Sequence, residues 1–235
     1  MVEWGDWRQK MVIRVLVEGG VVGINPTISA AQNAMIQQNS AALREALNRF
    51  FSSALNREDV DIRIEVGGGW KMAAYSFVMQ SNNDFLYVDL DRPPELRQDW
   101  FNQVLHDGQQ FPSSKAEYVF FWIQEMEAWF LKQPECIVKW AQHKKISIKG
   151  NAIIQNDNLI KDKDIEHLIQ KPSDVMDVIF KKYLVSDKIG KNGKPRKMTY
   201  GKLRHAPGLI QYLEPQRMLL QDKELSAFVS KVMNK

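Results

Sequence analysis

Cysteine and long apolar runs are what this 235-residue sequence has least of. Its one cysteine, Cys136, excludes an intrachain disulfide and a multi-cysteine zinc site, so a bound metal ion is expected to have oxygen ligands. The longest uninterrupted apolar stretch covers residues 118–123, far short of the roughly 20 residues of a membrane-spanning helix. We therefore expect a cytoplasmic protein that does not enter a membrane.

The net charge of the chain changes sign between its first and second parts. Residues 1–139 hold 13 basic and 18 acidic residues, a net charge of −5, whereas residues 140–235 hold 19 and 10, a net charge of +9. The segment 181–204 carries nine basic residues against one acid, Asp187. Such a density attracts a polyanion, although a solvated loop kept soluble by lysines explains it equally well.

Apolar runs that suit strands alternate with segments of helical periodicity in the first part of the chain. Strands are predicted at 11–17, 61–66, 85–90 and 118–123, and helices at about 29–55 and 71–81. Because the strands are continuously apolar, they are expected to be buried on both faces. The pattern predicts an α/β domain of Rossmann type with a mainly parallel sheet.

The character of the chain changes near residue 142, where we place a domain boundary between 1–141 and 142–235. The second part is expected to be a basic, mainly helical extension packed on the first. Helices are predicted at 164–170, 173–182 and 219–233, and a loop at 186–197. The Asn- and Gln-rich segment 25–39 has no role that its residues reveal.

Acidic side chains follow three of the four predicted strands. Glu18 ends the first, Asp89 and Asp91 end the third, and Glu127 follows the fourth, while three glycines at 67–69 follow the second. All these ends lie on one edge of a parallel sheet. Carboxylates gathered there repel one another unless a cation neutralises them, and Mg²⁺ suits such ligands and phosphodiester chemistry.

Each member of this group also has a purely structural interpretation. Glu18 is a common polar end to a strand before two glycines, Asp91 can shape a turn before Arg92-Pro93-Pro94, and Glu127 can complement a helix N-terminus. Their occurrence together favours a functional site more than any one of them does.

Together these residues resemble the TOPRIM pattern, in which a glutamate follows the first strand, glycines the second and Asp-x-Asp the third. More narrowly, the sequence resembles a bacterial TOPRIM-like family catalogued as domain of unknown function 4276, related to overcoming-lysogenization-defect nucleases and ribonuclease M5. The segments that carry the resemblance are VEGG at 17–20, GGGW at 67–70, VDLD at 88–91, IQEMEAWFL at 123–131, QKPSDV at 170–175 and TYGKLRHAPGLI at 199–210.

The resemblance implies a Mg²⁺-dependent nuclease site in which Mn²⁺ can substitute. Glu18 is then the general acid/base or a metal ligand, Asp89 and Asp91 are the metal-binding pair, and Glu127 is an additional acid. Three basic positions of the family complete the implied catalytic set: Lys171, Lys202 and His205. The further acid that nuclease-type members have after the Glu-Gly turn is missing, because the apolar residues Val21 and Val22 follow instead.

The leading hypothesis from the sequence is an endonuclease effector that cleaves DNA or tRNA. Family context adds a partner ATPase of the SMC or ABC type in an anti-phage defence system, which holds the nuclease latent, and leaves homo-oligomer formation open. The residues expected to bind nucleic acid belong to the basic segment: Lys191, Lys194, Arg196, Lys197 and Arg204. The alternative is a non-catalytic TOPRIM-like scaffold that binds an ATPase or nucleic acid.

Overall fold

The computed structural model describes residues 10–19, 27, 29–79, 84–105, 109–149, 154–189, 193 and 195–235. Its first elements are β1 (Met11–Val17), α1 (Ala30–Leu55), β2 (Val60–Val66), α2 (Trp70–Met79), β3 (Phe85–Asp89), η1 (Pro94–Leu96), α3 (Arg97–Gln103), α4 (Ser113–Ala116), β4 (Val119–Trp122), α5 (Ala128–Lys132) and α6 (Glu135–His143). The later ones are β5 (Ser147–Ile148), η2 (Ile154–Asn156), α7 (Ile165–Leu168), α8 (Pro172–Tyr183), β6 (Leu184–Ile189), β7 (Pro195–Lys197), α9 (Lys202–Ile210), α10 (Pro215–Gln221) and α11 (Lys223–Met233).

The central sheet has four strands in the order β2-β1-β3-β4, and every neighbouring pair is parallel. Val17 at the end of β1 pairs with Val66 of β2 and Tyr87 of β3, and Asp89 pairs with Trp122 at the end of β4. The carboxyl ends therefore meet at one edge. The expected α/β class with a parallel sheet is confirmed, and the arrangement is consistent with a Rossmann-like fold.

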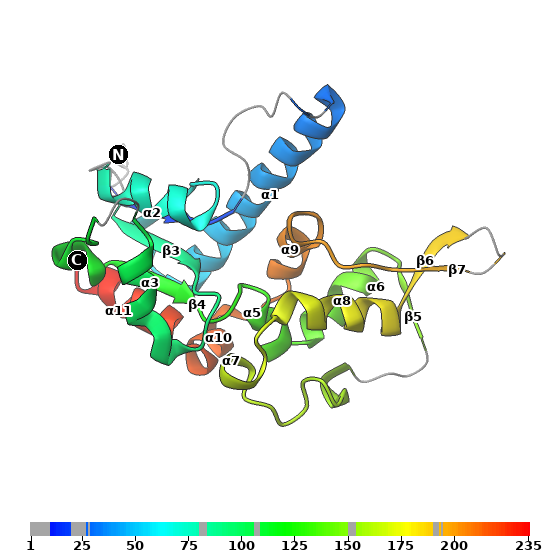
Figure 1. Ribbon diagram of the computed structural model, residues 1–235. Coiled ribbons are helices and arrows are strands. Elements are labelled where there is room, and N and C mark those ends of the chain that lie inside the picture. Colours follow the sequence, from blue (N-terminus) through cyan, green and yellow to red (C-terminus); the bar gives the residue numbers. More distant parts are fainter. Residues whose placement is uncertain are drawn as a thin grey trace, which may run out of the picture.

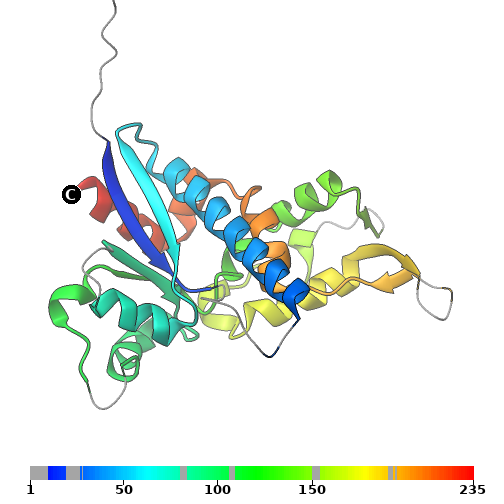
Figure 2. The ribbon, with the colours of Figure 1, turned by 90° about the horizontal axis from the view of Figure 1, so that it is seen from above.

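Successive side chains of the strands enter two different cores, as the period of two in a strand requires. Leu16, Leu86 and Phe121 pack with residues of α2 and α3 on one face of the sheet. Val15 and Tyr87 belong to the larger core on the other face, which α1, α5, α6 and the C-terminal helices cover. The sheet thus lies between two groups of helices (Figures 1 and 2).

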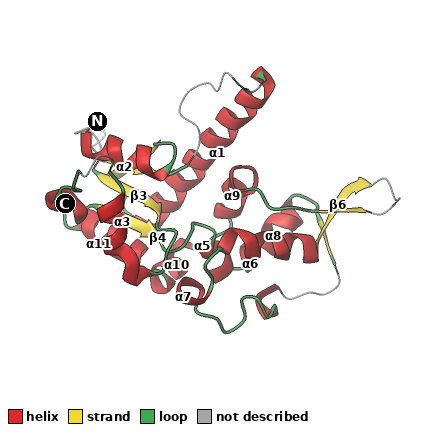
Figure 3. Cartoon of the chain, in the orientation of Figure 1, coloured by secondary structure: helices red, strands yellow, loops and turns green. Residues whose placement is uncertain are grey.

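A small antiparallel sheet, β5-β6-β7, lies away from the central one, and its β6–β7 hairpin extends from the body (Figures 1 and 3). The sequence interpretation of 186–197 as a loop is therefore wrong at both of its ends. Val185 and Ile189 of β6 pair with Lys197 and Pro195 of β7, and Val185 also pairs with Ser147 of β5. Because part of this pairing involves a distant segment, turn-forming residues alone did not reveal the strands.

The predicted closing helix over 219–233 is two helices, α10 and α11, separated at Asp222. The carboxylate of Asp222 accepts the Leu225 N–H at 2.8 Å and so caps α11, while its own backbone is extended. The apolar periodicity continues across the break, which explains why the sequence indicated one helix.

Helix α11 returns to the central sheet and completes the larger core. The ring of Phe228 lies 5.3 Å from that of Phe85, 5.4 Å from that of Phe120 and 5.1 Å from that of Phe51. This core therefore contains residues from before and after residue 142. Among the described helices, none has both the length and the apolarity to cross a membrane.

We expect Phe228→Ala to lower the free energy of unfolding by about 3–5 kcal/mol, because it leaves a cavity where four aromatic rings meet. Leu220→Ala is the matched control, since Leu220 is 88% exposed and its truncation should cost little. Urea unfolding of both variants measures the difference. Equal losses in the two variants would show that α11 does not contribute to the core as described.

Candidate functional site

The loops that follow β1 and β2 are held together at the carboxyl edge. Gly19 has φ of 128°, and its N–H donates to the Gly68 carbonyl at 2.9 Å. A Cβ on Gly67 would approach the side chain of Ala73 to 2.8 Å. Glycines are therefore needed at both turns, and their close approach positions Glu18 beside β3.

Asp89 is the last residue of β3 and is 5% exposed. Its N–H donates to Glu18 Oε2 at 3.1 Å, and its Oδ1 accepts the Met126 N–H at 2.9 Å. Its Oδ2 forms an ion pair with the ammonium of Lys202, the first residue of α9. Through its N–H and its carboxylate, Asp89 therefore connects the end of β1, the loop after β4 and the C-terminal part of the chain.

Asp91 lies two residues further, at the surface, with φ of 56°. Its N–H donates to the carbonyl of Gln124 at 2.7 Å, and Gln124 also has a positive φ, 61°. The left-handed conformation, which aspartate tolerates better than most residues, turns the chain away from the sheet. The loops after β3 and β4 are thereby joined beside Asp89.

Glu127 precedes α5 and is completely buried. The Tyr200 hydroxyl donates to its Oε1 at 2.9 Å, whereas Oε2 accepts no hydrogen bond and lies 3.6 Å from Lys202 Nζ. The neighbouring Glu125 accepts the Ser173 N–H of α8 at 2.7 Å. The sequence did not single out Tyr200, although it lies in the segment 199–210, two residues before Lys202.

Lys202 is the cation that compensates this cluster. Burial by itself would lower the pKa of its ammonium, but Asp89 and Glu127 outweigh that effect and raise it, so Lys202 stays charged. Its side chain is 36% exposed, whereas Asp89 and Glu127 are 6% and 0% exposed at theirs. In these ion pairs the lysine is therefore partly exposed to solvent, whereas both acids are buried.

Negative charge remains in excess around the site. Burial, followed by repulsion from Asp89, raises the pKa of Glu18 to about 8. Partial burial and the charges of Asp89 and Glu125 raise the pKa of Asp91, which Lys171 at the start of α8 partly offsets. Burial also raises the pKa of Glu127, against the attraction of Lys202. The cluster thus favours binding of a further proton or cation.

The expected metal ligands Glu18, Asp89 and Asp91 lie at this edge, and their oxygens are of the type that Mg²⁺ prefers. Within the part of the chain that the structure describes, however, no three His, Cys, Asp or Glu residues form a group that could hold a metal ion. The Lys202 ammonium instead occupies the cation's place at Asp89. The donor chemistry fits a divalent cation, but the present arrangement does not.

His205, an implied catalytic residue, makes no recorded hydrogen bond or ion pair with these acids among the described residues. Its Nδ1 accepts the Gly201 N–H at 2.9 Å, and its ring lies 5.5 Å from that of Trp140 and 5.2 Å from that of Phe180. Burial and the adjacent Arg204 lower its pKa to about 4, so the ring is neutral at pH 7. These contacts assign it to the packing of the first turn of α9.

Arg196, Lys197 and Arg204 are exposed and line one cavity beside His205. The other two residues expected to bind nucleic acid, Lys191 and Lys194, lie outside the described residues. Residues 30–39 of the unassigned segment form the beginning of α1, and Ser29 caps that helix by accepting the Gln32 N–H.

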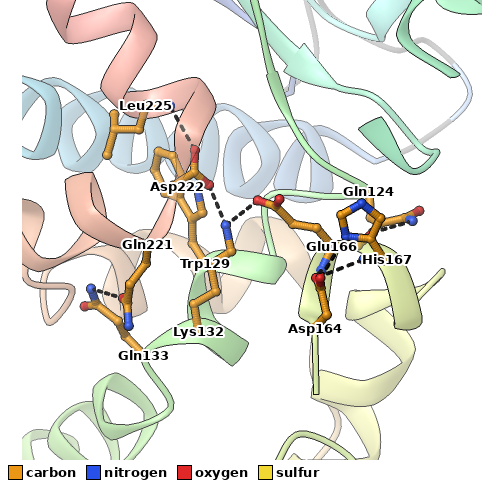
Figure 4. A network of polar contacts seen from close by, with 10 residues as sticks. All are labelled: Gln124, Trp129, Lys132, Gln133, Asp164, Glu166, His167, Gln221, Asp222 and Leu225. Carbon is orange, nitrogen blue, oxygen red and sulfur yellow. Dashed lines mark hydrogen bonds and ion pairs between the residues drawn. The ribbon is translucent and has the colours of Figure 1, made fainter. Parts of the chain in front are cut away.

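A partly buried network of hydrogen bonds and ion pairs next to α5 joins the segments around the site (Figure 4). Lys132 Nζ lies 2.5 Å from Glu166 Oε1 and 2.8 Å from Asp222 Oδ2, and the Trp129 indole N–H donates to the same Asp222 oxygen. The Gln124 amide donates to the Glu166 carbonyl at 2.9 Å. The loop after β4 is therefore fixed to α7 and to the start of α11.

Comparisons with models of protein families, with curated proteins and with solved structures find no match to this chain in any of the three.

Glu18→Gln should make stability less sensitive to pH between 4.5, the ordinary pKa, and about 8, the pKa in the folded protein. Over this interval the folded wild type retains a proton that the unfolded chain loses, so its free energy of unfolding falls as pH rises, by on the order of 3 kcal/mol. The variant has no ionisable side chain at position 18, so this contribution to the pH dependence is absent. Urea unfolding at both limits, with the exposed Glu58→Gln as control, measures the effect. Parallel pH profiles for wild type and Glu18→Gln would contradict it.

Lys202→Met should lower the free energy of unfolding at pH 7 by about 2–3 kcal/mol, because the buried carboxylates of Asp89 and Glu127 lose the cation that neutralises them. Lys231→Met is the control: Lys231 is similarly exposed, 34%, but its partner Glu117 is 57% exposed. That pair should contribute little, because both of its charges remain in contact with water. Thermal and urea unfolding test the contrast, and a loss for Lys202→Met no larger than the control's would disprove it.

Proposed function

We propose that the acidic edge is the active site of a TOPRIM-type endonuclease that requires Mg²⁺ and cleaves DNA or structured RNA such as tRNA. The observation that carries the proposal is the convergence of Glu18, Asp89 and Asp91 from the ends of β1 and β3. Excess carboxylate charge with raised pKa values is typical of sites that transfer protons or bind cations. The ordered TOPRIM-like segments support the same assignment.

The side chains of the site divide the chemistry among themselves. Glu18, with a pKa of about 8, is suited to exchanging a proton near neutral pH, as a general acid/base must. Lys171 and Lys202 place positive charge beside the acids, where it can stabilise a phosphoryl group whose charge increases in the transition state. Mg²⁺, or Mn²⁺ in its place, supplies Lewis-acid polarisation when bound. Because the Lys202 ammonium occupies the cation's place at Asp89, it would have to leave this carboxylate before a metal ion could bind there.

Restraint by a partner ATPase of the SMC or ABC type is part of the proposal. The pairing of Lys202 with Asp89 supports it, because a site closed by its own lysine is suited to release by a partner. The resemblance to defence-associated proteins supports the class of partner.

A non-catalytic scaffold is the second candidate. It is favoured by the structural contacts of the acids: Asp89 binds the Met126 N–H and Lys202, and Glu125 caps α8 through the Ser173 N–H. Acids that serve only as caps and counter-ions need neither a metal ion nor a substrate. The two candidates therefore differ at Asp91, whose carboxylate is near the surface and makes no side-chain hydrogen bond recorded among the described residues.

Asp91→Asn should abolish saturable binding of Mn²⁺ or Mg²⁺, measured by calorimetry, and should lower cleavage of plasmid, single-stranded DNA or tRNA by about 100-fold or more. Asp162→Asn is the matched control. Asp162 is also exposed and has φ of 55°, close to the 56° of Asp91, so asparagine fits both backbones equally well.

The outcomes separate the two candidates. Metal binding by wild type and by Asp162→Asn, but not by Asp91→Asn, supports the nuclease. The absence of binding and cleavage in all three folded proteins, with nucleic acid and the ATPase present, favours the scaffold. Cleavage that persists unchanged in Asp91→Asn would refute the proposed active site.

A further inference from the structure

A cavity of about 290 Å³ lies between the β6–β7 hairpin and the first turn of α9. It is separate from the carboxylates of the acidic edge, and none of its lining residues is acidic. They combine cationic, hydroxyl and imidazole groups, chiefly Ser186, Arg196, Lys197, Thr199, Arg204 and His205. In Figure 1 the β6–β7 hairpin extends away from the central sheet, and α9 lies between the hairpin and α1. The acidic-site proposal does not use this cavity.

Six of the nine basic residues of the segment 181–204 have described side chains, and these six fall into two groups. Lys181 pairs with Asp177, Lys182 with Asp157 and Lys202 with Asp89. Arg196, Lys197 and Arg204 take part in no ion pair recorded among the described residues, and all three line the cavity. Three cations without a recorded ion pair thus line one cavity, an arrangement suited to binding an anion.

His205 adds a directed donor to this cavity. It is only 3% exposed, and its Nδ1 accepts the Gly201 N–H, so the proton of the neutral ring belongs on Nε2. None of the described residues accepts a hydrogen bond from Nε2 in a recorded contact. A ring N–H in the lining of a cationic cavity, with no recorded acceptor among the described residues, suits a ligand that supplies acceptor oxygens.

We propose that this cavity is a phosphate subsite, which binds one phosphate group of a nucleic-acid strand. Arg196, Lys197 and Arg204 neutralise the phosphate, and Thr199 and His205 Nε2 donate to its oxygens. Arginine matches phosphate because its planar fork donates two parallel hydrogen bonds. The inference rests on the proposed function for the identity of the strand, but the phosphate chemistry rests on the cavity alone.

The cavity is connected to the acidic edge through the segment 199–205. The Tyr200 hydroxyl binds Glu127, the Gly201 N–H binds His205, and Lys202 binds Asp89. Lys202 and His205 are three residues apart at the start of α9, about one turn or 5 Å along its axis. A phosphate held by Arg204 and His205 therefore places its strand next to the helix that closes the acidic edge.

The test compares Arg204→Gln with Arg63→Gln, which also removes one exposed arginine but from β2. A single-stranded oligodeoxynucleotide is the first probe, without metal ion, and inorganic phosphate is the second. Arg204→Gln should weaken oligonucleotide binding at least tenfold and should reduce the slope of log K against log salt concentration by about 0.7. Arg63→Gln should change neither. Inorganic phosphate should compete weakly for the same site in wild type.

Arg196→Gln on β7 is a second variant, which keeps the test valid if Arg204→Gln fails to fold. Equal effects of the cavity variants and Arg63→Gln would overturn the subsite. Tight binding of inorganic phosphate without binding of the oligonucleotide would overturn its assignment to a strand. Because the assay omits metal ions and measures no cleavage, failure of the nuclease proposal leaves this result unaffected.

Discussion

The carboxylate of Asp89 is the group on which the arrangement of the site depends. It is almost completely buried, and it meets the backbone N–H of Met126 on one oxygen and the ammonium of Lys202 on the other. A buried charge without such partners would cost several kcal/mol. The loop after β4 and the first turn of α9 must therefore both be in place for the sheet edge to keep this acid.

The opposite charges of the two parts of the chain meet at this point. The part with a net charge of −5 contributes Glu18, Asp89, Asp91 and Glu127, and the part with a net charge of +9 contributes Lys202. Burial, together with repulsion between acids that one ammonium does not balance, raises the pKa values of Glu18, Asp91 and Glu127. Three further cations of the second part, Arg196, Lys197 and Arg204, line a different cavity beside His205.

The segment 199–205 thus takes part in two environments of opposite sign. Tyr200 and Lys202 contact the acids, whereas Thr199, Arg204 and His205 line the basic cavity. The aromatic rings of Trp140 and Phe180 pack against the ring of His205 and so hold the segment 199–205 in place. One turn of α9 therefore contributes to both environments.

The amino-acid sequence by itself determined the α/β class, the approximate limits of the four parallel strands and the gathering of Glu18, Asp89 and Asp91 at one edge. These follow from local periodicity and from the geometry of parallel sheets, which places all carboxyl ends together. Only the tertiary structure decided that Lys202, 113 residues from Asp89, would neutralise it, that Tyr200 would bind Glu127, and that His205 would accept the Gly201 N–H. It also decided the β6–β7 pairing and the break at Asp222. Periodicity reports the conformation of neighbouring residues, whereas the partner of a buried charge depends on which distant segments pack beside it.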